Sequence, residues 1–115
     1  MQGTFTIIKT NGDTITHPTV AKGPGLEQIQ EAVGGWIEKV PFFDTYNNQR
    51  AVCYCNEEGK LDRLPYNEKA TQLWQAQNQN RLDDALVGDV AILSGDKEFI
   101  RSLGDDDGDD EDDAD

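Results

Sequence analysis

The sequence predicts an α+β fold in which two helices pack against a mostly antiparallel sheet of five or six short strands. Three observations lead to this prediction. Short β-branched and aromatic runs are separated by turn signals, two apolar stripes have helical spacing, and a regular strand–helix–strand alternation is absent. A chain of 115 residues has room for one hydrophobic core, so we expect a single domain over residues 1–103.

The N-terminal part is expected to form a β-hairpin. Residues 4–10 are rich in Thr, Ile and Phe, and residues 14–16 resume this pattern after Asn11-Gly12. Asn-Gly between two such runs is the strongest short-range signal for a tight hairpin, so Gly12 is interpreted as a turn residue. His17-Pro18 is expected to end the second strand, because proline has no N–H for a ladder hydrogen bond.

A short helix is expected next, because Leu26, Ile29 and Val33 recur at spacings that place them on one helical face. Gly34 and Gly35 follow directly and are interpreted as the residues that end this helix. Glycine enters the left-handed region without the penalty that a Cβ imposes. We therefore expect a positive φ at one or both of these glycines.

Further strands are expected over residues 36–40, 50–55 and 87–93. The apolar composition of the last of these predicts that it is the most buried. After residue 55 the chain reaches a turn in which Gly59 is available for a positive φ. Residues 61–64 are expected to run back from this turn as a hairpin partner.

A second helix is expected after Pro65, with Asn67 as its N-cap and Trp74 on its apolar stripe. Residues 72–80 are rich in Gln and Asn, so this helix is expected to fray into a polar loop. Trp74 borders that stretch and is therefore predicted to be partly exposed. Residues 98–103 are expected to form a final helical turn.

The formal charge of −13 is concentrated at the C-terminal end. Nine of the 23 acidic residues lie in the last eleven positions, which leaves 14 acids against all 10 bases elsewhere, a net charge of −4. From residue 104 onward no apolar residue is larger than alanine, so burial cannot offset the entropy cost of ordering. A disordered acidic tail is therefore expected over residues 104–115. Its candidate interaction residues are Asp105, Asp106, Asp107, Asp109, Asp110, Glu111, Asp112 and Asp113.

The composition also restricts location and partners. No segment approaches the ~20 apolar residues of a membrane-spanning helix, and residues 1–5 lack the features of a signal peptide. We therefore expect a protein of the host-cell cytoplasm. Its acidic balance argues against direct binding to nucleic acid or to an anionic membrane, since both would repel it.

The chemistry-bearing residues are few. Cys53, Cys55 and His17 are the only soft metal ligands, too few for a structural zinc site, and the cysteines are expected to be free thiols. The loop at residues 23–25 precedes a helix and could present N–H groups to an anion, but its proline removes one donor. We expect no catalytic residues, no metal and no cofactor, and therefore a protein that is not an enzyme.

Four ordered segments carry a resemblance to a known family. Residues 33–40 (VGGWIEKV), 55–61 (CNEEGKL), 64–67 (LPYN) and 87–93 (VGDVAIL) resemble the pattern of domain-of-unknown-function family 3846 over roughly residues 26–95. The resemblance implies a gene of a phage, plasmid or other mobile element, and it brings no activity or catalytic residues. The pattern itself is rich in turn and cap positions, namely Gly34, Gly35, Gly59 and Pro65, so backbone geometry explains much of it.

The leading hypothesis is a non-enzymatic accessory protein that binds and modulates a host macromolecule, in counter-defence or host take-over. Its expected partner is a host or phage protein with a basic surface, met by Trp74, by Glu57 and Glu58 on a solvent-exposed turn, and by the tail. Two alternatives stay open. One is a small ligand or nucleotide-type signal bound between the sheet and the helix start at residues 25–26. The other is an acidic competitor of nucleic acid for a basic protein surface.

Overall fold

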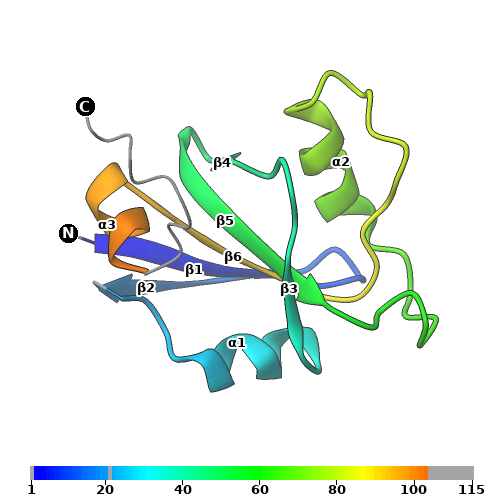
Figure 1. Cartoon of the computed structure of the whole chain (residues 1–115), viewed down its shortest axis with the longest axis horizontal. Coiled ribbons are helices and arrows are strands. Elements are labelled where there is room, and N and C mark those ends of the chain that lie inside the picture. Colours follow the sequence, from blue (N-terminus) through cyan, green and yellow to red (C-terminus); the bar gives the residue numbers. More distant parts are fainter. Residues whose placement is uncertain (1, 21, 104–115) are drawn as a thin grey trace.

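The computed structural model describes residues 2–20 and 22–103 and confirms the α+β fold (Figure 1). Its six-stranded antiparallel sheet has the order β2-β1-β6-β5-β3, with β4 also paired to β5. The strands are β1 (Gln2–Ile8), β2 (Thr14–Val20), β3 (Ile37–Lys39), β4 (Thr45–Tyr46), β5 (Gln49–Asn56) and β6 (Val90–Gly95). The helices of the described residues are α1 (Leu26–Val33), α2 (Glu68–Ala76) and α3 (Lys97–Ser102). The acidic tail over residues 104–115 lies outside the described residues.

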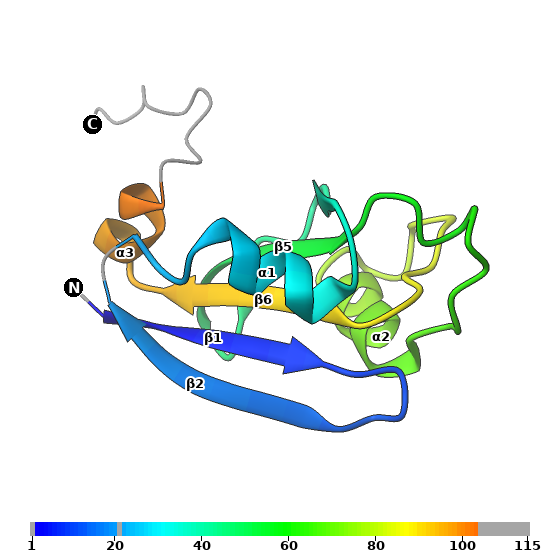
Figure 2. The ribbon, with the colours of Figure 1, turned by 90° about the horizontal axis from the view of Figure 1, so that it is seen from below.

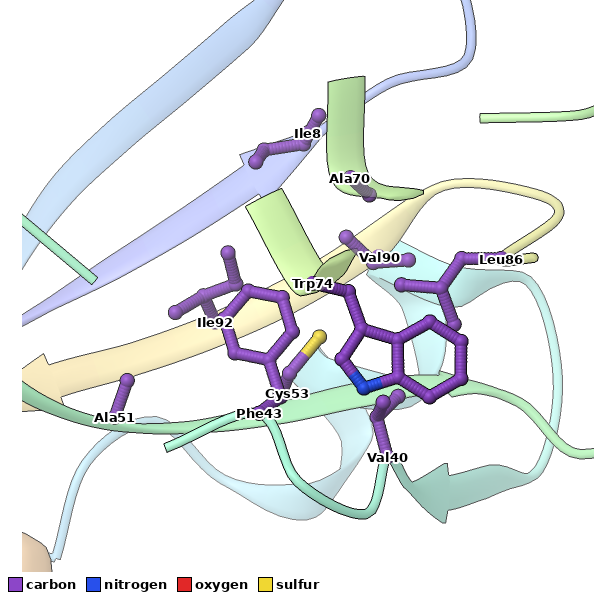
Figure 3. Close-up of a cluster of buried hydrophobic side chains, with 10 residues drawn as sticks. All are labelled: Ile8, Val40, Phe43, Ala51, Cys53, Ala70, Trp74, Leu86, Val90 and Ile92. Atoms are coloured by element: carbon purple, nitrogen blue, oxygen red, sulfur yellow. The ribbon is translucent and has the colours of Figure 1, made fainter. Parts of the chain in front are cut away.

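The helices cover both faces of the sheet, with α1 below and α2 above it in Figure 1. Figure 2 shows α1 lying along β6 and α3 close to the end at which β6 finishes. On the α1 and α3 side, the buried cluster contains Phe5, Ile29, Val33, Ala91, Leu93 and Phe99. On the α2 side, the cluster shown in Figure 3 contains Ile8, Val40, Phe43, Ala51, Cys53, Ala70, Trp74, Leu86, Val90 and Ile92. Two cores on opposite faces of one sheet therefore hold the domain together.

The predicted hairpin turn is confirmed. Gly12 has φ of 96°, and its N–H donates a 2.9 Å hydrogen bond to the carbonyl oxygen of Lys9. The N–H of Lys9 in turn donates to the carbonyl oxygen of Asp13 at 2.8 Å. The turn therefore closes with the positive φ for which Asn-Gly is suited.

The prediction that His17-Pro18 ends the second strand was wrong, because β2 continues through both residues to Val20. β2 is an edge strand, and Pro18 lies opposite Thr4 of β1. In an antiparallel ladder, hydrogen-bonded residue pairs alternate with pairs that exchange no hydrogen bond. Lys9–Asp13 is a hydrogen-bonded pair, so Thr4–Pro18, five pairs further along the ladder, is a pair without hydrogen bonds. An N–H at position 18 would point away from the sheet, so proline there removes no hydrogen bond between β1 and β2.

The two predicted helix boundaries that rest on capping are confirmed. α1 ends at Gly34, which has φ of 83° and whose N–H donates to the carbonyl oxygen of Gln30. α2 begins after Asn67, whose side chain accepts a hydrogen bond from the N–H of Ala70. Both caps depend on residues within one turn of the helix end, which explains why the sequence indicates them.

The expectation that residues 72–80 fray into a polar loop was wrong for the first half of that stretch, which is helical to Ala76. The amide side chains of Gln77 and Asn78 bond to the backbone of a segment far away in the sequence. The Oε1 atom of Gln77 accepts from the N–H groups of Asp44 and Thr45, at 2.8 and 3.0 Å. Asn78 donates to the carbonyl oxygen of Phe42 at 2.9 Å. These bonds attach the segment before β4 to the end of α2.

The predicted exposure of Trp74 was also wrong. Its side chain is only 4% exposed and belongs to the core on the α2 side. The indole N–H donates a 2.8 Å hydrogen bond to the carbonyl oxygen of Pro41. The segment that leaves β3 therefore covers the ring, and sequence proximity to polar residues did not reveal this long-range contact.

Residues 61–64 do not form the expected strand but continue a series of turns. The reason is that β5 already pairs with β6 on one side and with β3 and β4 on the other. Gly59 has no positive φ; a Cβ there would lie 3.0 Å from Val87 Cγ2, so close packing rather than backbone conformation favours glycine. The last strand begins at Val90 rather than at Val87, which forms an isolated bridge with Tyr66.

Candidate binding cavity at the β3 edge

A cavity of about 330 Å³ opens on the α2 side of the sheet, next to the edge strand β3. Its apolar lining comes from elements far apart in the sequence: Val40, Pro41, Cys55, Leu61, Trp74, Ala85, Leu86 and Val87. Its polar lining is Glu38, Lys39, Asn56, Glu57, Lys60 and Asp84. A volume of this size is at the lower end of the range for small-molecule sites, at roughly 300 Å³. We call this site the β3-edge cavity.

Strand alternation decides which side chains of β3 reach the cavity. Glu38 lies opposite Cys55, and Lys39 lies opposite Tyr54. Tyr54 packs against the core on the α1 side, whereas Cys55 packs against the core on the α2 side. Since successive side chains on a strand point to opposite faces, the Glu38 carboxylate faces the cavity side and the Lys39 ammonium the other. Both residues line the cavity, and strand alternation directs only the Glu38 charge toward it.

Asn56, the last residue of β5, connects the turn that follows it to the end of α1. Its Nδ2 atom donates to the carbonyl oxygen of Val33 at 3.2 Å, and its Oδ1 atom accepts from the N–H of Glu58 at 2.8 Å. A Cβ on Gly35 would lie 2.9 Å from Asn56 Nδ2, so glycine is required there for close approach. Gly34, in contrast, has the predicted positive φ.

Three of the four segments that carry the family resemblance meet at this site. Residues 33–40 supply Glu38 and Val40, residues 55–61 supply Cys55 and the turn, and residues 87–93 supply Val87. Asn56 bonds the first two segments directly, through the contact with Val33. The turn and cap residues of the pattern, Gly34, Gly35, Gly59 and Pro65, are not part of the cavity lining.

Burial and neighbouring charges control the ionisable groups of the cavity. Burial raises the pKa of the Cys55 thiol from its ordinary value of 9.0 to about 11, and the Glu38 carboxylate adds to this effect. A thiol with this pKa is protonated at neutral pH and is a weak nucleophile. The hydrogen bond from the Lys60 ammonium lowers the pKa of the Asp84 carboxyl, with which it also forms an ion pair. Cys53, buried beneath, is likewise free, and burial raises the pKa of its thiol well above the ordinary value.

The predicted interaction residues are only partly brought together. Glu57 and Glu58 are exposed on the turn after β5, as expected. The tryptophan beside them is Trp36 rather than Trp74. It is 69% exposed, and its carbonyl oxygen accepts a 2.8 Å hydrogen bond from the N–H of Glu57. The acidic residues of the tail lie outside the described residues.

Sequence reasoning missed Trp36, although a signal was present. Ile37 is the apolar residue of β3 that packs toward α1, so the alternation of the strand turns residues 36 and 38 away from that core. We call the exposed group of Trp36, Glu57 and Glu58 the Trp36 surface. It adjoins the β3-edge cavity, because Glu57 belongs to both.

A second hollow lies between the β1–β2 hairpin and the start of α1, where the small-ligand alternative placed its pocket. It has a volume of about 680 Å³ and is bordered near the helix start by Gly23, Pro24 and Gln28. Phe5 and His17 form part of its lining, with ring centroids 6.4 Å apart. We call it the hairpin groove.

Other kinds of site were sought in the described part of the chain. No group of three or more His, Cys, Asp or Glu side chains there is arranged to hold a metal ion. Among the helices of residues 2–20 and 22–103, none is long and apolar enough to cross a membrane.

Fold and site together define a small α+β protein with a helix-covered antiparallel sheet and an acid-rimmed cavity at one sheet edge. The chain belongs to the family described as "Domain of unknown function (DUF3846)", whose model matches residues 4–111. This match confirms the resemblance and extends it beyond residues 26–95 at both ends, so that it includes the β1–β2 hairpin. The searches of curated proteins and of solved structures found no match for the chain.

Proposed function

We propose that the protein is a non-enzymatic accessory protein of a phage or other mobile element that binds a host protein through a basic surface of that partner. The observation that carries the proposal is the Trp36 surface. Trp36 is 69% exposed and accepts a backbone hydrogen bond from Glu57, and Glu57 and Glu58 are both exposed on the same turn. In the described part of the chain neither carboxylate has a cation within ion-pair distance.

Physical arguments connect such a surface to a protein partner. Tryptophan is among the residue types most enriched in the positions that dominate binding energy at interfaces. Carboxylates around it favour a partner of opposite charge and raise the association rate. Residues 1–103 carry a net charge of −4 and the tail adds nine acids, so the long-range field attracts basic surfaces.

The proposal is tested by placing a photo-crosslinking amino acid at position 36 and expressing the protein in host cells. A captured partner is then purified, and its affinity is measured for wild type, Trp36→Ala and Val20→Ala. Val20 is 63% exposed but lies on β2, at the opposite sheet edge, and is the matched control. We expect Trp36→Ala to weaken binding by about tenfold or more and Val20→Ala to leave it unchanged. Equal affinities for all three proteins would refute the Trp36 surface as the binding site.

The second part of the proposal concerns the acidic tail. We propose that it steers association with the basic partner, and that it competes with nucleic acid where the partner binds one. The full chain and a chain ending at Gly104 are compared for association rate with the purified partner, at low and at physiological salt. Steering predicts a faster rate for the full chain, most clearly at low salt, where screening is weakest. Equal rates at low salt would remove the tail from the mechanism.

The mobile-element context is supported by the resemblance to the family and is tested separately. Genes that flank close relatives of this sequence should include phage or plasmid functions. A consistent chromosomal housekeeping neighbourhood would refute this part of the proposal without affecting the binding surface.

The hairpin groove favours one second candidate, a small planar ligand that lies against Phe5 and His17. Its volume of about 680 Å³ suits a ligand of nucleotide size. Mass spectrometry of the denatured protein, purified from its host, would detect a retained ligand. Bound ligand that is lost in a His17→Ala variant supports this candidate, and its absence from the wild-type protein speaks against it.

A further inference from the structure

We propose that the β3-edge cavity accepts an arginine side chain of the partner protein. This inference rests on the proposed function, because it names what the partner inserts next to the Trp36 surface. Two observations support it: an apolar interior, and carboxylates at the rim that lack a cation.

The interior suits the aliphatic part of a long side chain. Val40, Trp74 and Leu86 line it and belong to the same buried core, in which Figure 3 shows the indole of Trp74 close to the side chains of Val40 and Leu86. Arginine and lysine place their methylene stems against apolar surface while the charged group stays with polar partners. A volume of about 330 Å³ leaves room for one such side chain.

The rim suits the cationic end. Glu38 and Glu57 both line the cavity and are exposed. No cation lies within ion-pair distance of either one in the part of the chain that the structure describes. Lys60 pairs with Asp84, so the ammonium on the rim is already neutralised. Lys39 also lines the cavity, but its place opposite Tyr54 directs its ammonium toward the other face of the sheet. The remaining charge at the opening is therefore negative.

Arginine fits this arrangement better than lysine. Its guanidinium is planar and more weakly hydrated than an ammonium, it can bond a carboxylate through two parallel N–H groups, and it stacks on aromatic rings. Glu38 and Glu57 line the cavity from β3 and from the turn after β5, so a donor with several N–H groups suits this opening. The ammonium of lysine has fewer N–H groups and is more strongly hydrated, so it loses more hydration when it enters the cavity.

The test uses the full chain and two-dimensional NMR spectra, with the indole N–H of Trp74 as a reporter inside the cavity. Three probes are titrated: the Nα-acetyl amides of arginine, of lysine and of citrulline, the last being a neutral analogue of arginine. We expect saturable shifts at Trp74 and Leu86 for the arginine probe, weaker shifts for lysine and none for citrulline. In Glu38→Gln we expect the arginine affinity to fall about tenfold, because a charged hydrogen bond is lost.

Glu58→Gln is the matched control. Glu58 is exposed on the same turn but does not line the cavity, so its replacement should leave arginine affinity unchanged. Glu38 is also exposed, and well-dispersed spectra of both variants will show that each remains folded. Equal arginine affinities in wild type and Glu38→Gln, or shifts confined to other parts of the sheet, would overturn the inference.

Failure of this inference is distinguishable from failure of the proposed function. If the cavity does not bind the arginine probe but Trp36→Ala still weakens partner binding, the inference is wrong and the Trp36 surface is still supported as the binding site. If the cavity binds arginine and Glu38→Gln weakens partner binding about tenfold as well, the inference is supported for the complex. If the cavity binds arginine but partner affinity is insensitive to Glu38→Gln, the cavity does not receive the partner's side chain and the inference is overturned.

Discussion

The side-chain amide of Asn67, at the start of α2, donates a 2.9 Å hydrogen bond to the carbonyl oxygen of Ile8, at the end of β1. The same Nδ2 group donates to the carbonyl oxygen of Gly88 at 2.8 Å. The Oδ1 atom accepts from the N–H of Ala70 at 3.1 Å and so caps the helix. Asn67 is fully buried, and one side chain therefore joins α2, β1 and the segment before β6.

The first prediction concerns this junction. Asn67→Ala should lower the free energy of unfolding by about 3 kcal/mol or more, because two buried carbonyl groups and a helix cap lose their partner. Asn67→Ser keeps a cap acceptor but not the amide donors, so it should recover only about 1 kcal/mol of the loss. Urea denaturation of the three proteins measures both differences.

Asp96→Ala is the control for the cap alone. Asp96 caps α3 by accepting from the N–H of Phe99 at 2.8 Å, and it is exposed. Its replacement should cost about 1 kcal/mol. If Asn67→Ala costs no more than Asp96→Ala, the bonds to Ile8 and Gly88 contribute nothing beyond a cap.

The second prediction separates the two glycines after α1. Gly34→Ala should cost about 1 kcal/mol through its positive φ, in any background. Gly35→Ala should cost about 2 kcal/mol, because its Cβ would displace the Asn56 amide from the bonds to Val33 and Glu58.

A double-mutant cycle provides the check. In an Asn56→Ala background most of the cost of Gly35→Ala should disappear, with a coupling of about 1 kcal/mol or more, whereas the cost of Gly34→Ala should persist. Additive effects for Gly35 and Asn56 would show that the close approach is not what requires glycine at position 35.

The third prediction distinguishes the two tryptophans of the chain. Trp36→Phe should change the free energy of unfolding by less than about 0.5 kcal/mol, since the side chain is exposed. Trp74→Phe should cost about 2 kcal/mol, since the carbonyl oxygen of Pro41 loses its donor and the core loses volume. Each variant leaves a single tryptophan whose fluorescence can be quenched with acrylamide. Trp36 should be strongly quenched and Trp74 shielded; similar quenching of both would contradict the structure.

The fourth prediction concerns alkaline pH. The pKa of the Cys55 thiol rises from 9.0 to about 11 on folding, so between these values the unfolded chain has released a proton that the folded chain retains. Because the unfolded state then binds fewer protons, stability falls as pH rises. The contribution is fully present below pH 9 and is lost as pH rises through about 11.

Comparison of wild type with Cys55→Ala isolates this contribution, because tyrosine and lysine titrate equally in both proteins. The stability of wild type should decline more steeply from pH 9 upward than that of Cys55→Ala. Parallel stability curves across this range would show that the thiol has the same pKa in both states. Burial also raises the pKa of the Cys53 thiol, so Cys53 should add a slope of the same sign, which Cys53→Ala removes.

The fifth prediction treats the tail as separable. A chain that ends at Gly104 should have nearly the same thermal midpoint as the full chain, or a slightly higher one, because removing nine acids reduces self-repulsion. Calorimetry at low salt is the most sensitive measurement. A midpoint lowered by several degrees would mean that the tail packs on the domain and that the boundary at residue 104 is misplaced.

Several elements could be predicted because neighbours in the sequence decide them. The turn at Asn11-Gly12, the end of α1 at Gly34 and the start of α2 at Asn67 all depend on local φ or on a cap within one helical turn. The exposure of Glu57 and Glu58 could also be predicted, since they lie in a turn that the sequence marks clearly.

The errors arose where a distant segment decides the outcome. Pro18 stays within β2 because the strand order makes β2 an edge. Residues 61–64 form no strand because β3, β4 and β6 already occupy both sides of β5. Trp74 is buried because it packs in the core on the α2 side, where the carbonyl oxygen of Pro41, 33 residues earlier, accepts from its indole N–H.

By itself, therefore, the sequence determined the fold class, the capped helix ends and the hairpin turn, since these follow from periodicity, composition and contacts within a few residues. The family followed from the resemblance of four ordered segments to a known pattern. Only the tertiary structure decided which tryptophan is exposed and that residues 38, 57 and 84 share the rim of one cavity. The physical reason is that strand pairing and core packing join residues far apart in the chain. Local preferences carry no information about which distant partner a segment meets.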